Sequence, residues 1–210
     1  MKTINDMSLA FIQKCYKQMG WKMFEANHKD YNVNLWAYRT FDCNSDMPND
    51  YIGLTWKDTK GVWQHRVWLC TTDPGIQGLL NPPKKEGTAI IKHSEFYKAA
   101  FAIGIHAAAN SNYAHEALRQ VRDMKYWRDN NKDKVRDYSG KVLTGLFNTN
   151  IHSTPRSWVF SPKIRFNSVG CFWVPDNKAF HDEFMDICRK ARSNWGNSFS
   201  LAFFYEGDLS

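Results

Sequence analysis

The sequence has no long hydrophobic run, no low-complexity segment and no internal repeat. Its N-terminal apolar stretch, within residues 1–21, is short and interrupted by polar side chains, unlike the core of a signal peptide or a membrane span. We therefore expect no membrane span, and synthesis in the cytoplasm without a signal peptide. Because a chain of 210 residues suits one hydrophobic core, the sequence predicts a single domain over residues 1–210.

Acidic residues are the scarcer charged type, 21 against 28 basic residues, which gives a net charge of +7 and a pI of about 9.1. This balance suits an anionic partner, such as a bacterial cell wall or nucleic acid. Basic residues do not alternate with aromatic ones as they do in a nucleic-acid motif, so we expect no specific nucleic-acid partner. The sequence leaves the oligomeric state open.

Metal-type spacing of cysteine and histidine is also lacking. The cysteines are Cys15, Cys43, Cys70, Cys171 and Cys188. An odd number without such spacing predicts reduced thiols. His115-Glu116 and His181-Asp182-Glu183 each lack the second histidine of a zinc-hydrolase motif. The other histidines have no acidic partner at ligand spacing, so we expect them at the surface or at the edge of the core. We expect no metal and no cofactor.

One acidic segment partly resembles the calcium loop of an EF-hand. Asp129–Asp137 places acidic or amide side chains at alternate positions. Lys134 stands where that loop needs glycine, and Gly140 stands where it needs a closing carboxylate. The favoured interpretation is a polar turn with Asx-type hydrogen bonds, and the sequence alone leaves calcium binding open.

Hydrophobic periodicity predicts a mainly β, α+β domain with a few peripheral helices. Helical spacing indicates helices over Asn5–Phe24, Ala114–Met124 and Phe180–Trp195. Alternation or β-branched runs indicate strands over Asn32–Ala37, Tyr51–Trp56, Val62–Cys70, Thr88–Lys92 and Ser198–Tyr205. The run Phe96–His106 is ambiguous, and Thr72-Asp73-Pro74-Gly75 is a strong turn signal.

The pair of His152 and Cys171 is the most informative feature. His152 ends an apolar stretch, and Cys171 follows the small residues Ser168 and Gly170. A histidine that takes the thiol proton lowers the thiol pKa and makes a nucleophile. Glycine lets the backbone turn tightly and bring its N–H groups near a reacting carbonyl.

This pattern resembles the signature of the L,D-transpeptidase catalytic domain, the cysteine enzymes that remodel peptidoglycan stem peptides. In that family a strand ends in His, and a loop leads to Ser/Thr-His-Gly-Cys; the match lies within residues 144–174. The resemblance implies a β-sandwich with Cys171 as nucleophile and His152 as base. It further implies that the Ser153 carbonyl orients the imidazole and that N–H groups around Gly170 hold the oxyanion.

The pocket residues depart from the family pattern. Ser168, Val169 and Trp173 are the expected substrate-binding positions, but Val169 replaces the family's histidine and Trp173 replaces its arginine or asparagine. The turn Thr71–Gly75 is also similar to a Thr-Pro-x-Gly turn of the family. The loss of two polar pocket residues favours hydrolysis over cross-linking.

The sequence therefore predicts a thiol-dependent peptidoglycan hydrolase, an endolysin-like peptidase that forms a thioester on Cys171. It would act at the cell wall after release or after delivery by a bacteriophage virion. Two alternatives stay open: a cross-linking L,D-transpeptidase, and a non-enzymatic virion or cell-wall-binding protein with the same fold. Paired carboxylates of a glycosidase are also not excluded, although nothing singles out Glu86, Glu95 or Asp123. Cys70 is a rival nucleophile, but its alternation with Trp68 and Arg66 indicates that it packs within a strand.

Overall fold

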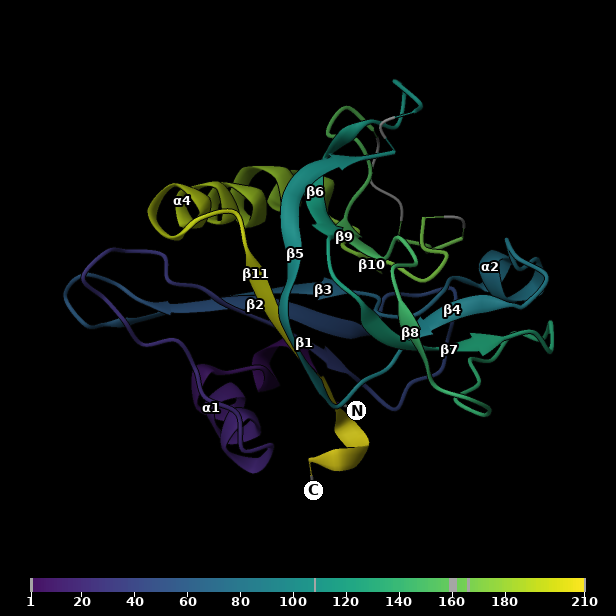
Figure 1. Ribbon diagram of the computed structural model, residues 1–210, viewed down its shortest axis with the longest axis horizontal. Helices are drawn as coiled ribbons and strands as arrows, with labels where there is room; N and C mark the ends of the chain where they lie inside the picture. Colours follow the sequence, from purple (N-terminus) through teal and green to yellow (C-terminus); the bar gives the residue numbers. More distant parts are fainter. Residues whose placement is uncertain (1, 108, 159–161, 166, 210) are drawn as a thin grey trace.

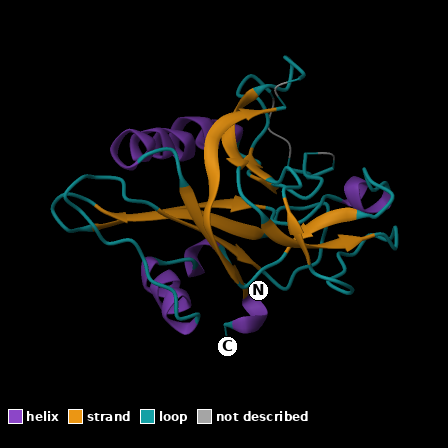
Figure 2. Cartoon of the chain, viewed as in Figure 1, coloured by secondary structure: helices purple, strands orange, loops and turns teal. Residues whose placement is uncertain are grey.

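The computed structural model describes residues 2–107, 109–158, 162–165 and 167–209. Two β-sheets form most of the regular structure in these ranges, and the helices lie outside the sheets (Figures 1 and 2). The predicted class, α+β and mainly β, is confirmed.

The larger sheet has eight strands in the order β10-β9-β6-β5-β11-β1-β2-β3. In chain order they are β1 (Asn34–Arg39), β2 (Asp50–Lys57), β3 (Trp63–Cys70), β5 (Glu95–His106), β6 (His115–Gln120), β9 (Asn150–His152), β10 (Phe172–Trp173) and β11 (Phe199–Tyr205). The pairs β1–β11 and β9–β10 are parallel, and the other pairs are antiparallel. Thr71, directly after β3, exchanges two backbone hydrogen bonds with Trp173 of β10, with N···O distances of 2.9 and 3.0 Å. The two edge strands therefore meet at one end of the sheet.

The smaller sheet has the antiparallel order β4-β7-β8. Its strands are β4 (Thr88–Ile91), β7 (Met124–Asp129) and β8 (Leu143–Gly145). It lies to one side of the large sheet with the short helix α2 (Ile76–Leu80), at the right of Figure 1.

Helices α1 (Leu9–Gln18) and α4 (Met185–Trp195) lie on opposite sides of the large sheet (Figure 1). The chain enters α4 through α3 (Asn177–Ala179) and the π-helical turn η2 (Phe180–Phe184), while the short turns η1 (Ile4–Asp6) and η3 (Glu206–Asp208) lie near the chain ends. Because each side of the sheet is covered, every residue of β1 is buried. Its Leu35 and Ala37 join the core with α4, and Trp36 and Tyr38 join the core with α1.

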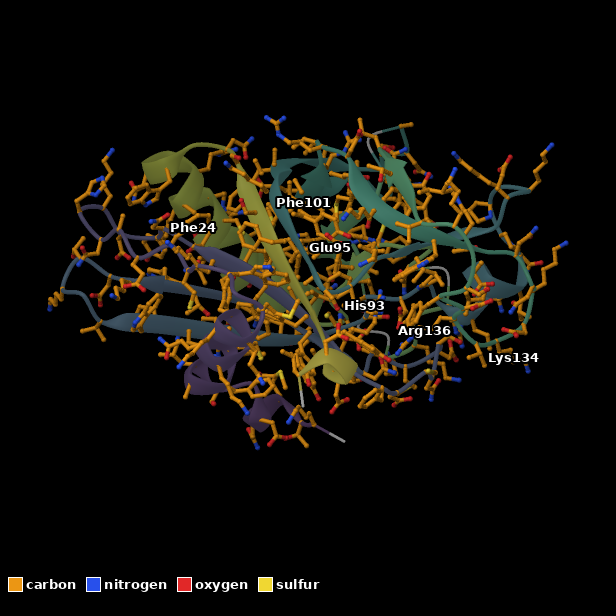
Figure 3. All side chains as sticks on the ribbon, turned by 60° about the horizontal axis from the view of Figure 1, so that its bottom comes forward. Phe24, His93, Glu95, Phe101, Lys134 and Arg136 are labelled. Atoms are coloured by element: carbon orange, nitrogen blue, oxygen red, sulfur yellow. The ribbon has the colours of Figure 1, made fainter. Side chains whose placement is uncertain are left out.

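A buried charge network lies where β1 and β2 meet the Thr71–Gly75 turn. Arg39 and Arg136 both pair with the Asp73 carboxylate, and Arg39 Nη2 lies 3.0 Å from Asp73 Oδ1. Asp50 accepts backbone hydrogen bonds on both carboxylate oxygens. Burial and the nearby Asp73 raise the pKa of Asp50 to about 6. In Figure 3, Arg136 lies further inside the molecule than Lys134.

Two helix predictions need correction. The first helix is shorter than Asn5–Phe24, because Ser8 caps its start through a hydrogen bond from Phe11 N and it ends at Gln18. The predicted helix over Ala114–Met124 is wrong: these residues form β6 and the start of β7. Pairing with β5 and β9 on either side overrides the helical spacing.

The predicted strands and the C-terminal helix agree with the structure at the level of elements. The turn predicted at Thr72–Gly75 is a bend at Asp73, and Gly75 is extended, with φ −67° and ψ 161°. The C-terminal helix appears as η2 followed by α4, the last strand is β11, and the ambiguous run before residue 107 is strand β5. No helix in the described ranges is long and apolar enough to cross a membrane.

Candidate functional site

His152 is held in one orientation and one tautomer at the end of β9. His152 is buried, with only 5% of its surface exposed. Ring atom Nδ1 lies 2.8 Å from the carbonyl oxygen of Ser153, so we assign the ring proton to Nδ1. The contact expected with the Ser153 carbonyl is present. It leaves Nε2 as the ring atom that can accept a proton.

Cys171 lies directly before β10, the strand that pairs with β9 and its His152. The parallel register of β9 and β10 pairs Ile151 with Phe172 and His152 with Trp173, so Cys171 lies opposite Asn150. Cys171 as a residue is partly exposed, but its thiol is largely shielded from solvent; Sγ donates to the carbonyl oxygen of Asn148 at 3.7 Å. In this state no hydrogen bond joins Sγ to the His152 ring, both residues being among those described. Catalytic hydrogen bonds are often formed only in the substrate complex.

Both groups are neutral in this arrangement. Burial raises the pKa of the Cys171 thiol to about 11. Burial, and next the neighbouring His106, hold the pKa of His152 well below its ordinary value. The expected lowering of the thiol pKa is therefore wrong for the substrate-free protein, because desolvation outweighs any stabilisation of the thiolate. Any nucleophilic reaction of this thiol would therefore need transfer of its proton to a neutral acceptor such as the His152 imidazole.

We expect Cys171 to be alkylated slowly by iodoacetamide at neutral pH, with a rate that keeps rising as the pH approaches the thiol pKa of about 11. Labelling of each cysteine is followed by mass spectrometry, with the exposed Cys43 as the internal reference. An inflection below about pH 7.5 that disappears in His152→Ala would contradict this expectation and indicate a preformed thiolate–imidazolium pair.

Two further histidines line the site, and the sequence did not single them out. The rings of His106 and His152 stack with centroids 3.9 Å apart and an interplanar angle of 12°. His115 lies 5.2 Å from His106 and 5.9 Å from His152 between ring centroids. His106 and His115 are register partners at the end of the β5–β6 hairpin. A predicted hairpin over this part of the chain would have placed them together, but a helix was predicted over Ala114–Met124 instead.

Two hollows of about 450 and 510 Å³ adjoin these histidines. The first is lined by His106, Ala107, Asn110, Tyr113, His115, His152, Ser153, Thr154, Pro155, Trp158, Arg165 and Asn167. The second is lined by Ile105, His106, Ala107, Ala109, Asn110, Arg119, Asn148 and Asn150. His152 thus opens into the first hollow. Cys171 is not among the lining residues of either hollow, but Asn148, whose carbonyl accepts the hydrogen bond from the Cys171 thiol, lines the second.

The charge of the two hollows is positive. Arg165 lines the first and Arg119 the second, and no Asp or Glu lines either one within the described ranges. Neither arginine forms an ion pair with any residue that the structure describes. Such a surface favours a ligand with free carboxylates, since arginine binds them through two parallel hydrogen bonds.

No family model, curated protein or solved structure matches the chain. Its chemistry is therefore inferred from the arrangement of its own residues.

The three predicted substrate-binding residues do not line the hollows. Trp173 is fully buried, and Ser168 is buried with Oγ near the carbonyl oxygens of Asp73 (2.9 Å) and Cys171 (2.7 Å). Val169 is partly exposed but packs toward Gly78 of α2. In this structure Ser168 and Trp173 therefore support the backbone that carries the thiol and cannot contact a ligand.

Gly170 is needed for the position of Cys171. Its φ of +106° lies in a region that side chains disfavour, and a Cβ there would lie 2.4 Å from the carbonyl oxygen of Ala89. Its own carbonyl accepts a hydrogen bond from Thr149 Oγ1 at 2.9 Å. The residue before the thiol is thus clamped between β4 and the start of β9.

Gly170→Ala should destabilise the protein more than Gly196→Ala. Both glycines have positive φ, but nothing lies within 4 Å of a Cβ built on Gly196. The steric conflict with Ala89 should add about 1–3 kcal/mol to the loss in free energy of unfolding. Urea denaturation of the two variants measures the difference. Equal losses would show that the backbone near Ala89 yields freely.

The remaining candidates have structural roles. Cys70 is fully buried in the core, and Glu95 pairs with Lys92 and Lys125 at 2.8 and 3.0 Å. In the Asp129–Asp137 loop, Asp129 Oδ2 accepts from Asp137 N at 2.9 Å, and Asp133 Oδ1 accepts a backbone hydrogen bond two residues on. The Asx-type turn predicted there is confirmed. No group of three or more His, Cys, Asp or Glu side chains in the described ranges is arranged to hold a metal ion.

Proposed function

We propose that the protein is a thiol-dependent peptidoglycan hydrolase with an L,D-transpeptidase-like fold, in which Cys171 is the nucleophile and His152 the base. The observation that carries the proposal is the parallel pairing of β9 with β10. It sets Cys171, directly before β10, beside the strand that carries a buried imidazole whose Nδ1 is fixed by the Ser153 carbonyl. Thiol, base and orienting group are the three parts that nucleophilic acyl transfer needs.

The proposed reaction begins with transfer of the thiol proton to Nε2 of His152 while Sγ bonds to the carbonyl carbon of the scissile peptide. Backbone N–H groups around Gly170 would stabilise the oxyanion. When the tetrahedral intermediate collapses, the C–N bond breaks and the imidazolium gives its proton to the leaving amine. A water molecule, deprotonated by His152, then attacks the thioester; the products are a free carboxylic acid and the restored thiol.

The charge of the site supports a stem peptide of peptidoglycan as substrate. Stem peptides carry free carboxylates, and the two hollows offer Arg119 and Arg165 with no acidic side chain among their described lining residues. The net charge of +7 would also raise the encounter rate with an anionic wall.

Hydrolysis is proposed over cross-linking because, among the described residues, the expected substrate-binding positions form no subsite for an amine acceptor. Trp173 is buried and Val169 lies outside both hollows. Cross-linking in water needs an acceptor site with a large effective molarity, which well-oriented groups reach at about 10⁵ M or more. Without such a site the thioester should react with water.

The test is digestion of purified peptidoglycan with the released fragments identified by mass spectrometry, in the presence of a labelled D-amino acid. The proposal predicts shortened or uncrosslinked stem peptides with new carboxyl ends and little label. Label incorporated in place of hydrolysis would support the transpeptidase alternative. Unchanged peptidoglycan, together with retention of the protein on the wall, would contradict the enzyme and support a wall-binding protein.

A further inference from the structure

We propose that His106 is a positioning residue of this site. Its ring stacks on the His152 imidazole and holds it in the orientation that proton transfer from Cys171 requires. The inference rests on the proposed function for its catalytic meaning. The contact between the two rings is part of the structure and does not depend on that function.

The stack supplies a constraint that the Ser153 carbonyl cannot supply. One hydrogen bond at Nδ1 fixes a single atom of the His152 ring and lets the ring swing about the N···O line. The His106 ring lies nearly parallel to it at 3.9 Å between centroids, so a tilt of His152 on that side would drive the rings together. The bond and the stack together fix the direction of Nε2.

His106 is itself held by the strand that carries the base. Asn150, two residues before His152 on β9, places its Nδ2 at 3.1 Å from His106 Nδ1. Its Oδ1 accepts from Gln120 N at 3.2 Å, which sets the orientation of the amide and directs its N–H group toward His106. His106 Nδ1 is therefore an acceptor, and the proton of this ring is on Nε2.

This hydrogen bond also keeps His106 neutral. A protonated His106 could not accept from Asn150, and it would place a positive charge against the ring that has to take the thiol proton. Burial, and next His115, lower the pKa of His106 to about 4. Other titratable or charged groups face the His106–His152 pair: His115 and Arg119 of β6, Arg165 in the first hollow and Cys171 beside β10.

A shared metal ion does not explain the cluster. The two stacked rings are within 12° of parallel, so the lone pairs of their nitrogens do not converge on one point.

The two contributions of His106 can be separated by substitution. His106→Phe keeps a flat ring for the stack and loses the acceptor for Asn150, whereas His106→Gln keeps an acceptor and loses the ring. His106→Ala loses both. His28→Gln is the matched control, because His28 packs on Trp195, away from the site.

Two measurements decide the proposal. The first is an NMR pH titration of the His152 ring nitrogens in wild type and each variant, which needs no substrate. We expect Nδ1 protonated and Nε2 unprotonated in the wild type, and in His106→Ala a second tautomer together with a pKa that rises toward about 6.5. The second is kcat and KM on a stem peptide. We expect kcat to fall about 100-fold in His106→Ala with little change in KM, because the base is misplaced.

His106→Phe should recover most of kcat and most of the His152 titration curve, and His106→Gln should recover neither. The proposal is overturned if the His152 titration is the same in wild type and His106→Ala, or if Gln rescues and Phe does not. If His106→Ala does not fold, the Phe and Gln variants decide by the same criteria. Should the wild type have no hydrolase activity, the proposed function fails, while the NMR titration still decides whether His106 controls His152.

Discussion

Cys171→Ser should lower the rate of peptidoglycan cleavage by about 10³-fold or more and leave the melting temperature nearly unchanged. Serine has almost the volume of cysteine and can keep the hydrogen bond to the Asn148 carbonyl that the thiol makes at 3.7 Å. Its hydroxyl is a far weaker acid, so a neutral His152 cannot deprotonate it as readily. Release of soluble fragments from purified walls is the assay.

The matched control is Cys43→Ser. Cys43 is exposed, and its Sγ also donates to a backbone carbonyl, that of Phe41 at 3.3 Å. It has no contact with His152 in the described structure, so full activity is expected. Activity retained in Cys171→Ser, or lost in Cys43→Ser, would contradict the assignment of Cys171 as the nucleophile.

Asp73→Asn should produce the largest loss of stability, about 3–5 kcal/mol in the free energy of unfolding. Asp73 is 3% exposed and pairs with the buried Arg39 and Arg136. Asparagine keeps the shape but removes the negative charge, so two buried guanidinium groups lose their shared partner. Denaturation by guanidinium chloride, followed by circular dichroism, measures the loss.

The control for Asp73 is Glu116→Gln. Glu116 pairs with Arg189 at 2.6 Å, but both side chains are partly exposed, at 28% and 39%. Removal of such a pair should cost less than about 1 kcal/mol. If both variants lose the same free energy of unfolding, Asp50 alone neutralises the buried arginines, and the ion pairs of Asp73 do not stabilise the segment around it.

The loss at Asp73 should extend to the site. Its backbone carbonyl lies 2.9 Å from Ser168 Oγ, and the Gly75 N–H donates to the Ser168 carbonyl at 2.9 Å. The turn that Asp73 anchors is therefore bonded to the loop that carries Cys171. A lower activity in Asp73→Asn, measured at a temperature at which the variant is folded, would confirm that link.

Local patterns in the sequence determined the mainly β class, most of the strands and the C-terminal helix. Alternating residues such as Val33, Leu35 and Ala37 report the period of a strand without knowledge of its partners. The sequence also predicted a tight backbone turn at Gly170, and the φ of +106° there agrees with it. The contact of His152 with the Ser153 carbonyl was implied by the family resemblance and is present in the structure.

Tertiary structure alone decided the rest. Whether Ala117 and Leu118 are helical or extended depends on β5 and β9, which flank them in the sheet; β9 is distant in the sequence. The stacking of His106 on His152 joins residues that are 46 positions apart. The pKa values of Cys171 and His152 follow from desolvation, which only the folded packing sets. Short-range periodicity reports the local backbone, whereas burial and charge pairing depend on which distant segments lie against it.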